Sequence, residues 1–372
     1  MIAGHPVYAL SLVGDVFTSL LVALALPLVA SVILSGLTNA LILRIGSVTR
    51  ATMSWYVLMP LVTASAATGV ALLFHPGTGP PLDFSVAASP MHDDVLQHIV
   101  RRSLLWTIGI SAMTAVAIAG LHRRGHPLTR TAVDGIARMN AFVMRILSLM
   151  MSFAPIGVFA LVTTTIAVQS RGGVGQFASA LLAIYIAEIV VCVGLVAALR
   201  RAGATHPIAA VSEVFLTALA TGNSSATLPV ELETAEKYFR VPRAVYSFTL
   251  PLGVAMSKVG SAAYFAVACI FAANASGVAV NGLMPLQVIV TAALMSVLTP
   301  PGGGSIAILG IVFAKVGVPV KMAALVAAIP LAGRLNTPVN ALGRLCTTVY
   351  VARRHATANV PTADSPLVEA AS

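Results

Sequence analysis

The sequence predicts an all-helical protein that crosses a membrane several times. Of its 372 residues, 58% are hydrophobic and only 9% are charged, and the mean hydropathy is +0.93. A soluble domain carries about 25% charged residues. Stretches such as 16–43, 51–82 and 103–122 contain no Asp, Glu, Lys or Arg. Because one helical crossing needs roughly 20 apolar residues, several crossings fit in this chain.

The first half of the chain is expected to form continuous membrane-spanning helices. Each follows one long apolar stretch, and they are predicted at 12–43, 52–74, 102–121, 133–167 and 176–199. The segment 75–100 is rich in Pro, Gly and Asp, which favour turns, so an external loop is expected there.

Beyond residue 207 the apolar segments are interrupted. In TALATGNSSATLPV, Ser224 and Ser225 lie between two short apolar arms. This pattern predicts a re-entrant hairpin, since irregular backbone at membrane depth must be satisfied by protein or by a water-filled cavity. The next apolar segment, from Tyr246 to Gly277, is broken by SKVGS at 257–261, which favours a helix that opens to bind a ligand.

The same pair of features occurs a second time. A second hairpin is expected around 288–318, with PPGGGS at its tip, where glycines let backbone amides approach a ligand closely. The final helix, 322–351, is interrupted by NTPVN, because Pro338 removes a backbone donor. Two units of a hairpin followed by a broken helix form an inverted repeat, which predicts a binding site near the bilayer midplane.

The motifs SSATLP, YSFTLPLG, PPGGGS and NTPVNALGR occur in this order. Together they resemble the dicarboxylate/amino acid:cation symporter family, which includes the glutamate transporters, most strongly from Ala154 to Arg354. The resemblance implies a homotrimer that works as an elevator. It aligns 12–43 with the family's second helix, so either the start of the chain is placed late or this member lacks one scaffold helix.

The resemblance also divides the transmembrane unit, residues 1–355, into two parts. The scaffold helices would be 12–43, 102–121 and 133–167. The transport part would comprise 52–74, 176–199 and 207–352. After it, 356–372 is expected to be a disordered cytoplasmic tail, because it is polar and rich in Ala and Pro.

The net charge of +10 follows the topology that the resemblance implies. The loops then predicted inside are basic and lie at 44–50, 122–138, 200–201, 237–243 and 353–354. Positive loops mark the cytoplasmic side of a membrane. We therefore expect an inner-membrane protein of seven crossings, with the N-terminus outside if the first helix is absent and the C-terminus inside. Nucleic acid is not an expected partner.

The resemblance implies that the hairpin tips and the final helix contact the substrate. The candidate contacts are Ser224, Ser225, Pro301, Gly302, Gly303, Gly304, Thr337 and Asn340. Asn336 stands where acidic amino acid transporters have the arginine that holds the side-chain carboxylate. Gly333 stands where they have the aspartate that holds the amino group. A small organic anion is therefore the expected substrate, without a strict requirement for an amino acid.

The sodium ligands that the family uses are largely replaced. Its Asn-Met-Asp-Gly-Thr motif reads Ser257, Lys258, Val259, Gly260 and Ser261 here, and Arg344 stands in place of a second carboxylate. Hard cations bind to clusters of oxygen ligands, normally with a carboxylate. Sodium binding in the family's manner is therefore not expected, nor is a cofactor.

The two basic residues at membrane depth need an explanation. A lysine or arginine at the centre of a spanning helix costs about 2.5–3.5 kcal/mol on insertion scales. We expect Lys258 and Arg344 to act as tethered positive charges that balance the substrate, with Glu188 as a candidate charge partner. Sodium-independent exchange, facilitated diffusion and proton coupling all stay open.

Other classes of protein are weighed against this one. Cys192, Cys269 and Cys346 are too far apart in sequence to indicate a metal site, and no nucleophile elbow, P-loop or dinucleotide motif occurs, so an enzyme is not expected. Two alternatives remain. The chain could be a non-transporting or degenerate relative with a regulatory or assembly role, or an anion-conducting pore lined by Lys258 and Arg344.

Overall fold

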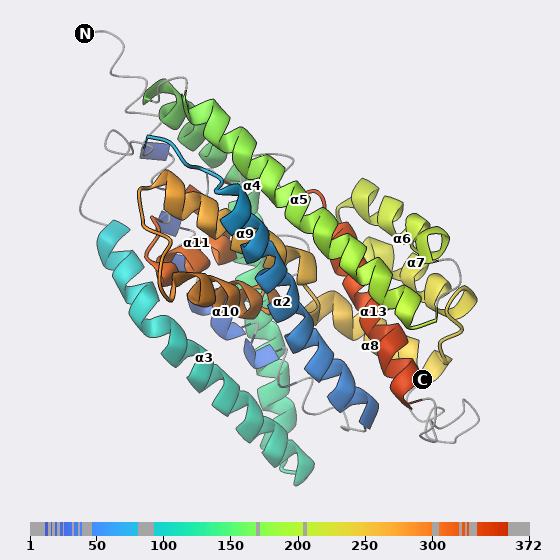
Figure 1. Cartoon of the computed structure of the whole chain (residues 1–372). Coiled ribbons are helices and arrows are strands. Elements are labelled where there is room, and N and C mark those ends of the chain that lie inside the picture. The colour runs from blue at the N-terminus through green and yellow to red at the C-terminus, as the bar shows by residue number, and fades with distance from the viewer. Residues whose placement is uncertain are drawn as a thin grey trace.

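The computed structural model describes residues 47–80, 93–168, 172–203, 207–299, 305–319 and 333–355, together with scattered positions in 12–38 and 322–326. All secondary-structure elements within these residues are α-helices (Figure 1). The predicted all-helical class is therefore confirmed. Of the predicted first helix, 12–43, only part is described, and each described residue there is helical. The predicted tail, 356–372, lies outside the described residues.

Within the part of the chain that the structure describes, three helical segments are long and apolar enough to cross a membrane: Arg50–Phe74, Gly175–Arg201 and Arg243–Ala275. They correspond to α2 (Ser47–Phe74), α5 (Gly172–Arg201) and the pair formed by α8 (Arg243–Met256) and α9 (Val259–Ala275). The break between α8 and α9 falls at residues 257–258, as the sequence predicts.

The next two helices begin earlier than the sequence indicates. They are α3 (Asp93–Arg123) and α4 (Leu128–Val168). The predicted loop over 75–100 is too long, because α3 already begins at Asp93. Two aspartates at a helix N-terminus are favourable beside the positive end of the helix dipole.

Helix α9 lies at the centre of the described structure. All of its residues except Asn274 are buried, and it packs against α2, α5, α10 and α13. Its sequence is rich in Gly, Ala and Ser, and small residues let helices approach closely in a membrane. In Figure 1, α2, α5 and α13 run beside one another along the length of the molecule. The helices that carry Glu188, Asn340 and Arg344, α5 and α13, are therefore held against one buried helix.

Two helix pairs correspond to the predicted hairpins. The first is α6 (Pro207–Thr221) and α7 (Ser224–Lys237), joined by Gly222 and Asn223. The second is α10 (Met284–Val297) and α11 (Ser305–Val316), and its tip, 300–304, lies outside the described residues. The members of each pair pack against each other. The last helix, α13, runs from Asn336 to His355.

Candidate anion and charge site

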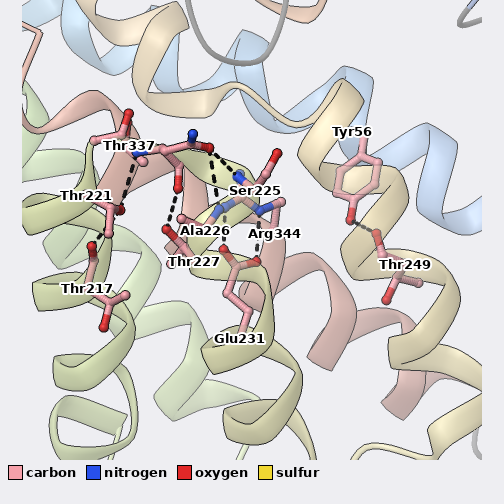
Figure 2. Close-up of polar contacts among 12 residues, drawn as sticks. Tyr56, Thr217, Thr221, Ser225, Ala226, Thr227, Glu231, Thr249, Thr337 and Arg344 are labelled. Carbon is pink, nitrogen blue, oxygen red and sulfur yellow. Dashed lines mark hydrogen bonds and ion pairs between the residues drawn. The ribbon is translucent and has the colours of Figure 1, made fainter.

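Three interruptions of the helices meet at one place. The side chain of Asn340 on α13 accepts a hydrogen bond from the backbone N–H of Gly260 at the start of α9, at 2.8 Å. The hydroxyl of Thr337 donates to the backbone carbonyl of Gly222 at the first hairpin tip, at 3.3 Å (Figure 2). The start of α13 thus contacts both the broken helix and the hairpin. It brings Thr337, Asn340 and Ser261, separated by up to 79 residues, into one site.

The first hairpin tip is built around Asn223. Gly222 has a φ of +60°, a left-handed conformation that suits glycine. The Asn223 side chain accepts from the backbone N–H groups of Ser225 and Ala226, at 2.8 and 3.4 Å, and so caps α7. Ser224 is buried and Ser225 is exposed. An anion at this tip would therefore have to displace Asn223 or use the Ser225 hydroxyl.

A basic side chain also lies near this tip. Arg334 is exposed, and a Cβ placed on Gly222 would lie 3.8 Å from its Nη1 atom. Gly333 is exposed, whereas Asn336 is buried and its Oδ1 atom has no hydrogen-bond partner among the described residues. Pro301 and Gly302 to Gly304, the candidate contacts from the second tip, lie outside the described residues. No described contact therefore tests their predicted role.

Arg344 forms a completely buried ion pair with Glu231. Its Nε donates to Oε2 at 2.9 Å, and its Nη2 contacts Oε1, so the pair is bidentate. Figure 2 shows the two side chains lying alongside each other between α7 and α13. Two-point contacts of this kind are among the stronger charged hydrogen bonds. The charge of Arg344 is thus neutralised within the protein.

Glu231 is not among the site residues predicted from the sequence. The sequence does point to such a partner, because an arginine buried at membrane depth requires a carboxylate beside it. Glu231 lies on the second arm of the hairpin, close in space to Arg344 but 113 residues away in sequence. The candidate that we named instead, Glu188, does not pair with Arg344 in the described structure. Both Glu188 oxygens lack a hydrogen-bond partner there.

Glycine at position 253 makes room for the arginine. A Cβ on Gly253 would lie only 2.8 Å from the Cγ and Cδ atoms of Arg344, and 2.5 Å from the Tyr56 hydroxyl. That hydroxyl donates to the Thr249 carbonyl at 2.7 Å, and the Thr249 and Thr348 hydroxyls are 2.8 Å apart. The arginine stem therefore passes through a tightly packed junction of α2, α8 and α13.

Lys258 is the second buried positive charge. It is only 4% exposed and stands just before the first residue of α9. It lies within electrostatic range of both Arg344 and Glu231. No described carboxylate forms an ion pair with its ammonium group. Because Arg344 and Glu231 neutralise each other, the cluster of Lys258, Arg344 and Glu231 carries one net positive formal charge.

Val259 fills the position where the resemblance places a sodium-binding carboxylate. Its side chain is fully buried, and it occupies the space that any Cβ on Gly343 would need. Its backbone carbonyl accepts a hydrogen bond from the Thr63 hydroxyl at 2.9 Å. Neighbouring Ser257 is buried as well, and its hydroxyl has no partner among the described residues. An apolar side chain therefore packs at the position where the resemblance places a charged ligand in other family members.

The contact between Val259 and Gly343 gives a direct prediction. We expect Gly343→Ala to destabilise the protein by about 1–3 kcal/mol, the usual cost of adding a methyl group to a packed core. Thermal unfolding of the purified protein in detergent measures this change. In the double variant with Val259→Ala, much of the loss should be recovered, because the colliding methyl groups are gone.

The matched control for that experiment is Gly109→Ala. Gly109 lies within α3, and nothing is found within 4 Å of a Cβ placed there. Alanine is favoured over glycine within a helix, so this variant should be neutral or slightly more stable. An equal effect of both substitutions would contradict the packing that we describe.

Buried charges at broken apolar helices are typical of membrane transport proteins. The chain belongs to the sodium:dicarboxylate symporter family, whose model matches residues 2–354. The family consists of transporters rather than enzymes, as the sequence predicted. This protein is therefore a multi-pass membrane protein of a transporter family. Its class implies a small anionic substrate.

Relatives in bacteria and animals support the assignment. The chain is 24% identical over 373 residues to the proton/sodium-glutamate symport protein of Bacillus subtilis, covering 92% of this chain and 85% of that protein. Identity to the protein of the same name from Geobacillus stearothermophilus is also 24%, over 384 residues, covering 94% and 89% of the two chains. The human excitatory amino acid transporter 2 is 29% identical over 220 residues, 57% of this chain and 38% of that one. The chain is thus a divergent member of its family.

Proposed function

We propose that this protein carries small organic anions, dicarboxylates or acidic amino acids, across the membrane without sodium coupling. The observation that carries the proposal is the buried ion pair of Arg344 with Glu231, within electrostatic range of Lys258, which forms no ion pair with a described carboxylate. Family membership and the names of the glutamate symporters support an anionic substrate.

The charge arrangement argues against a bound sodium ion. A sodium site needs several oxygen ligands and usually a carboxylate. The carboxylate of Glu231 already accepts two hydrogen bonds from Arg344, and the side chain of Val259 is a packed isopropyl group. A cation placed here would also meet the repulsion of Lys258. The residues present do not fit sodium, and the fixed net charge takes over the electrostatic role of a bound cation.

The same charge arrangement favours an anion. An ammonium group that is buried without a partner is costly, and a carboxylate nearby offsets that cost. The substrate would lie between the first hairpin tip and the start of α13, within reach of Ser225, Thr337 and the exposed Arg334. Pro301, Gly302, Gly303 and Gly304 of the second tip stay candidate contacts for it, as the resemblance implies.

We further infer that transport follows an elevator motion in a homotrimer at the inner membrane. The helix pairs α6/α7 and α10/α11 would be the re-entrant hairpins, moving with α2, α5, α8, α9 and α13 as one body. The packing supports this division, because α2, α5, α10, α11 and α13 contact α9, and α6, α7 and α8 contact α13. Residues 12–43, together with α3 and α4, would form the scaffold.

The testing experiment is uptake of labelled succinate, aspartate and glutamate into proteoliposomes, with and without an inward sodium gradient. Saturable uptake that does not change when choline replaces sodium is the expected result. Uptake driven by the sodium gradient would show that the ion binds despite the ion pair, and the coupling proposal would fall. If no labelled anion is taken up in any condition, the transport proposal itself fails. Currents that do not saturate with anion concentration would instead identify a pore.

A further inference from the structure

One buried acidic group has no role in the anion site described above. Glu188, on α5, is fully buried, and neither carboxylate oxygen has a hydrogen-bond partner among the described residues. It differs from Glu231, whose carboxylate is held by Arg344. A buried carboxylate without partners is costly when ionised and far less costly when it holds a proton. A group that changes between these forms needs a reason to be kept at membrane depth.

The surroundings of Glu188 contain few charges. The titratable groups in electrostatic contact with it are Tyr185 and Cys192 on its own helix and Tyr264 on α9. Helices α2, α6 and α13 also pack against α5. Their charged residues with described side chains are Arg50, Glu213, Arg344, Arg353 and Arg354. None of these forms an ion pair or hydrogen bond with Glu188 in the described structure.

A connection leads from Glu188 to the anion site. Tyr185 lies three residues before Glu188, on the same face of α5. It is half-buried and in electrostatic contact with both Glu188 and Arg334. Arg334 in turn lies near Gly222 at the first hairpin tip. A charge at the first hairpin tip and a charge on Glu188 therefore both act on Tyr185.

We propose that Glu188 is a proton-binding site that is filled together with the anion site. The proposal rests on the proposed function, because it assumes an anion at the hairpin tip. One proton from the surrounding water binds one Glu188 oxygen, and no other bond changes. The arriving anion adds negative charge near Arg334 and Tyr185, which disfavours an ionised Glu188. By reciprocity, a protonated Glu188 favours anion binding to the same extent.

Infrared difference spectroscopy on the purified full-length protein tests the site directly. Adding succinate or aspartate should produce the carbonyl band of one protonated carboxyl group in the wild type. The band should be absent from Glu188→Gln and present in the control Glu213→Gln, which removes an exposed carboxylate of α6. A band that persists in Glu188→Gln would overturn the assignment.

Transport gives the second measurement. An acid-outside pH gradient should accelerate saturable uptake by the wild type and by Glu213→Gln. In Glu188→Gln, uptake should no longer respond to the gradient, while exchange of internal for external anion continues, since glutamine imitates the protonated form. An undiminished response to the gradient in Glu188→Gln would contradict the proposal.

The experiments distinguish a failure of the proton-site proposal for Glu188 from a failure of the proposed anion transport. If no anion is transported, the infrared spectrum of the anion-free protein at acid and neutral pH still reports whether Glu188 takes up a proton. Where Glu188→Gln does not yield a monodisperse protein, Glu188→Asp serves instead. Its carboxyl band should appear at a shifted frequency if the proton resides at this position. An unshifted band would place the proton elsewhere.

Discussion

Replacing Arg344 by alanine should destabilise the protein by about 3–5 kcal/mol, the largest effect that we expect from a single substitution. The physical reason is that Glu231 would remain as a fully buried carboxylate without its partner. Glu231→Gln should have an effect of the same sign, because it leaves the guanidinium unpaired. Thermal unfolding in detergent, with size-exclusion chromatography as a check on the fold, measures both.

A double variant at positions 231 and 344 separates the free-energy cost of one unpaired buried charge from the net stabilisation that the ion pair provides. Replacing both residues by apolar ones of similar size, Arg344→Met with Glu231→Leu, should recover most of the lost stability, since a buried ion pair is often no better than apolar packing. The matched control is Glu233→Gln, which removes an exposed carboxylate from the same helix, α7. If Arg344→Ala is as stable as this control, the buried ion pair is not formed.

Stability and transport should respond differently in the double variant. Because the pair is neutral as a unit, removing both members keeps the net charge of the cluster. Anion uptake by the double variant should therefore remain indifferent to sodium if the tethered charge is Lys258. A gain of sodium dependence would show that Arg344 itself excludes the ion.

Replacing Lys258 by methionine should reduce kcat/KM for anion uptake on the order of tenfold to a hundredfold. Hydrogen bonds to charged groups are worth about 1.5–3 kcal/mol, and about 1.4 kcal/mol corresponds to tenfold. Methionine keeps the length and apolar character of the side chain, so the fold should persist, and loss of a buried unpaired charge should not lower the unfolding temperature. Initial rates of labelled succinate and aspartate uptake, against substrate concentration, measure the effect.

The control for this variant is Lys258→Arg, which keeps the positive charge. It should retain more activity than Lys258→Met, although the larger guanidinium must fit where Lys258 is only 4% exposed. Equal rates for wild type and Lys258→Met would show that the lysine does not balance the substrate charge. Arg334→Gln would then be the next variant, because Arg334 is the exposed arginine near the hairpin tip.

The sequence by itself determined the class and the location of the interruptions. The lack of charged residues in long apolar stretches predicts membrane-spanning helices, and the family prediction from four motifs is confirmed. The break between α8 and α9 at Ser257 and Lys258 was also predictable, since a lysine in an apolar helix marks a local change in the environment. Local composition suffices for these features, because each depends on neighbouring residues.

Only the tertiary structure decided which charges meet. The sequence places Lys258 and Arg344 at membrane depth but does not indicate that Arg344 is neutralised by Glu231, which lies 113 residues away on another helix. Nor does it show that Glu188 has no hydrogen-bond partner among the residues that the structure describes. Pairing over such separations depends on how α7 packs against α13 and how α5 and α13 pack against α9. The free energy of a buried charge depends on the partner that the packing supplies. The sequence therefore defines a transporter with altered charges, and the fold assigns each charge its neighbour.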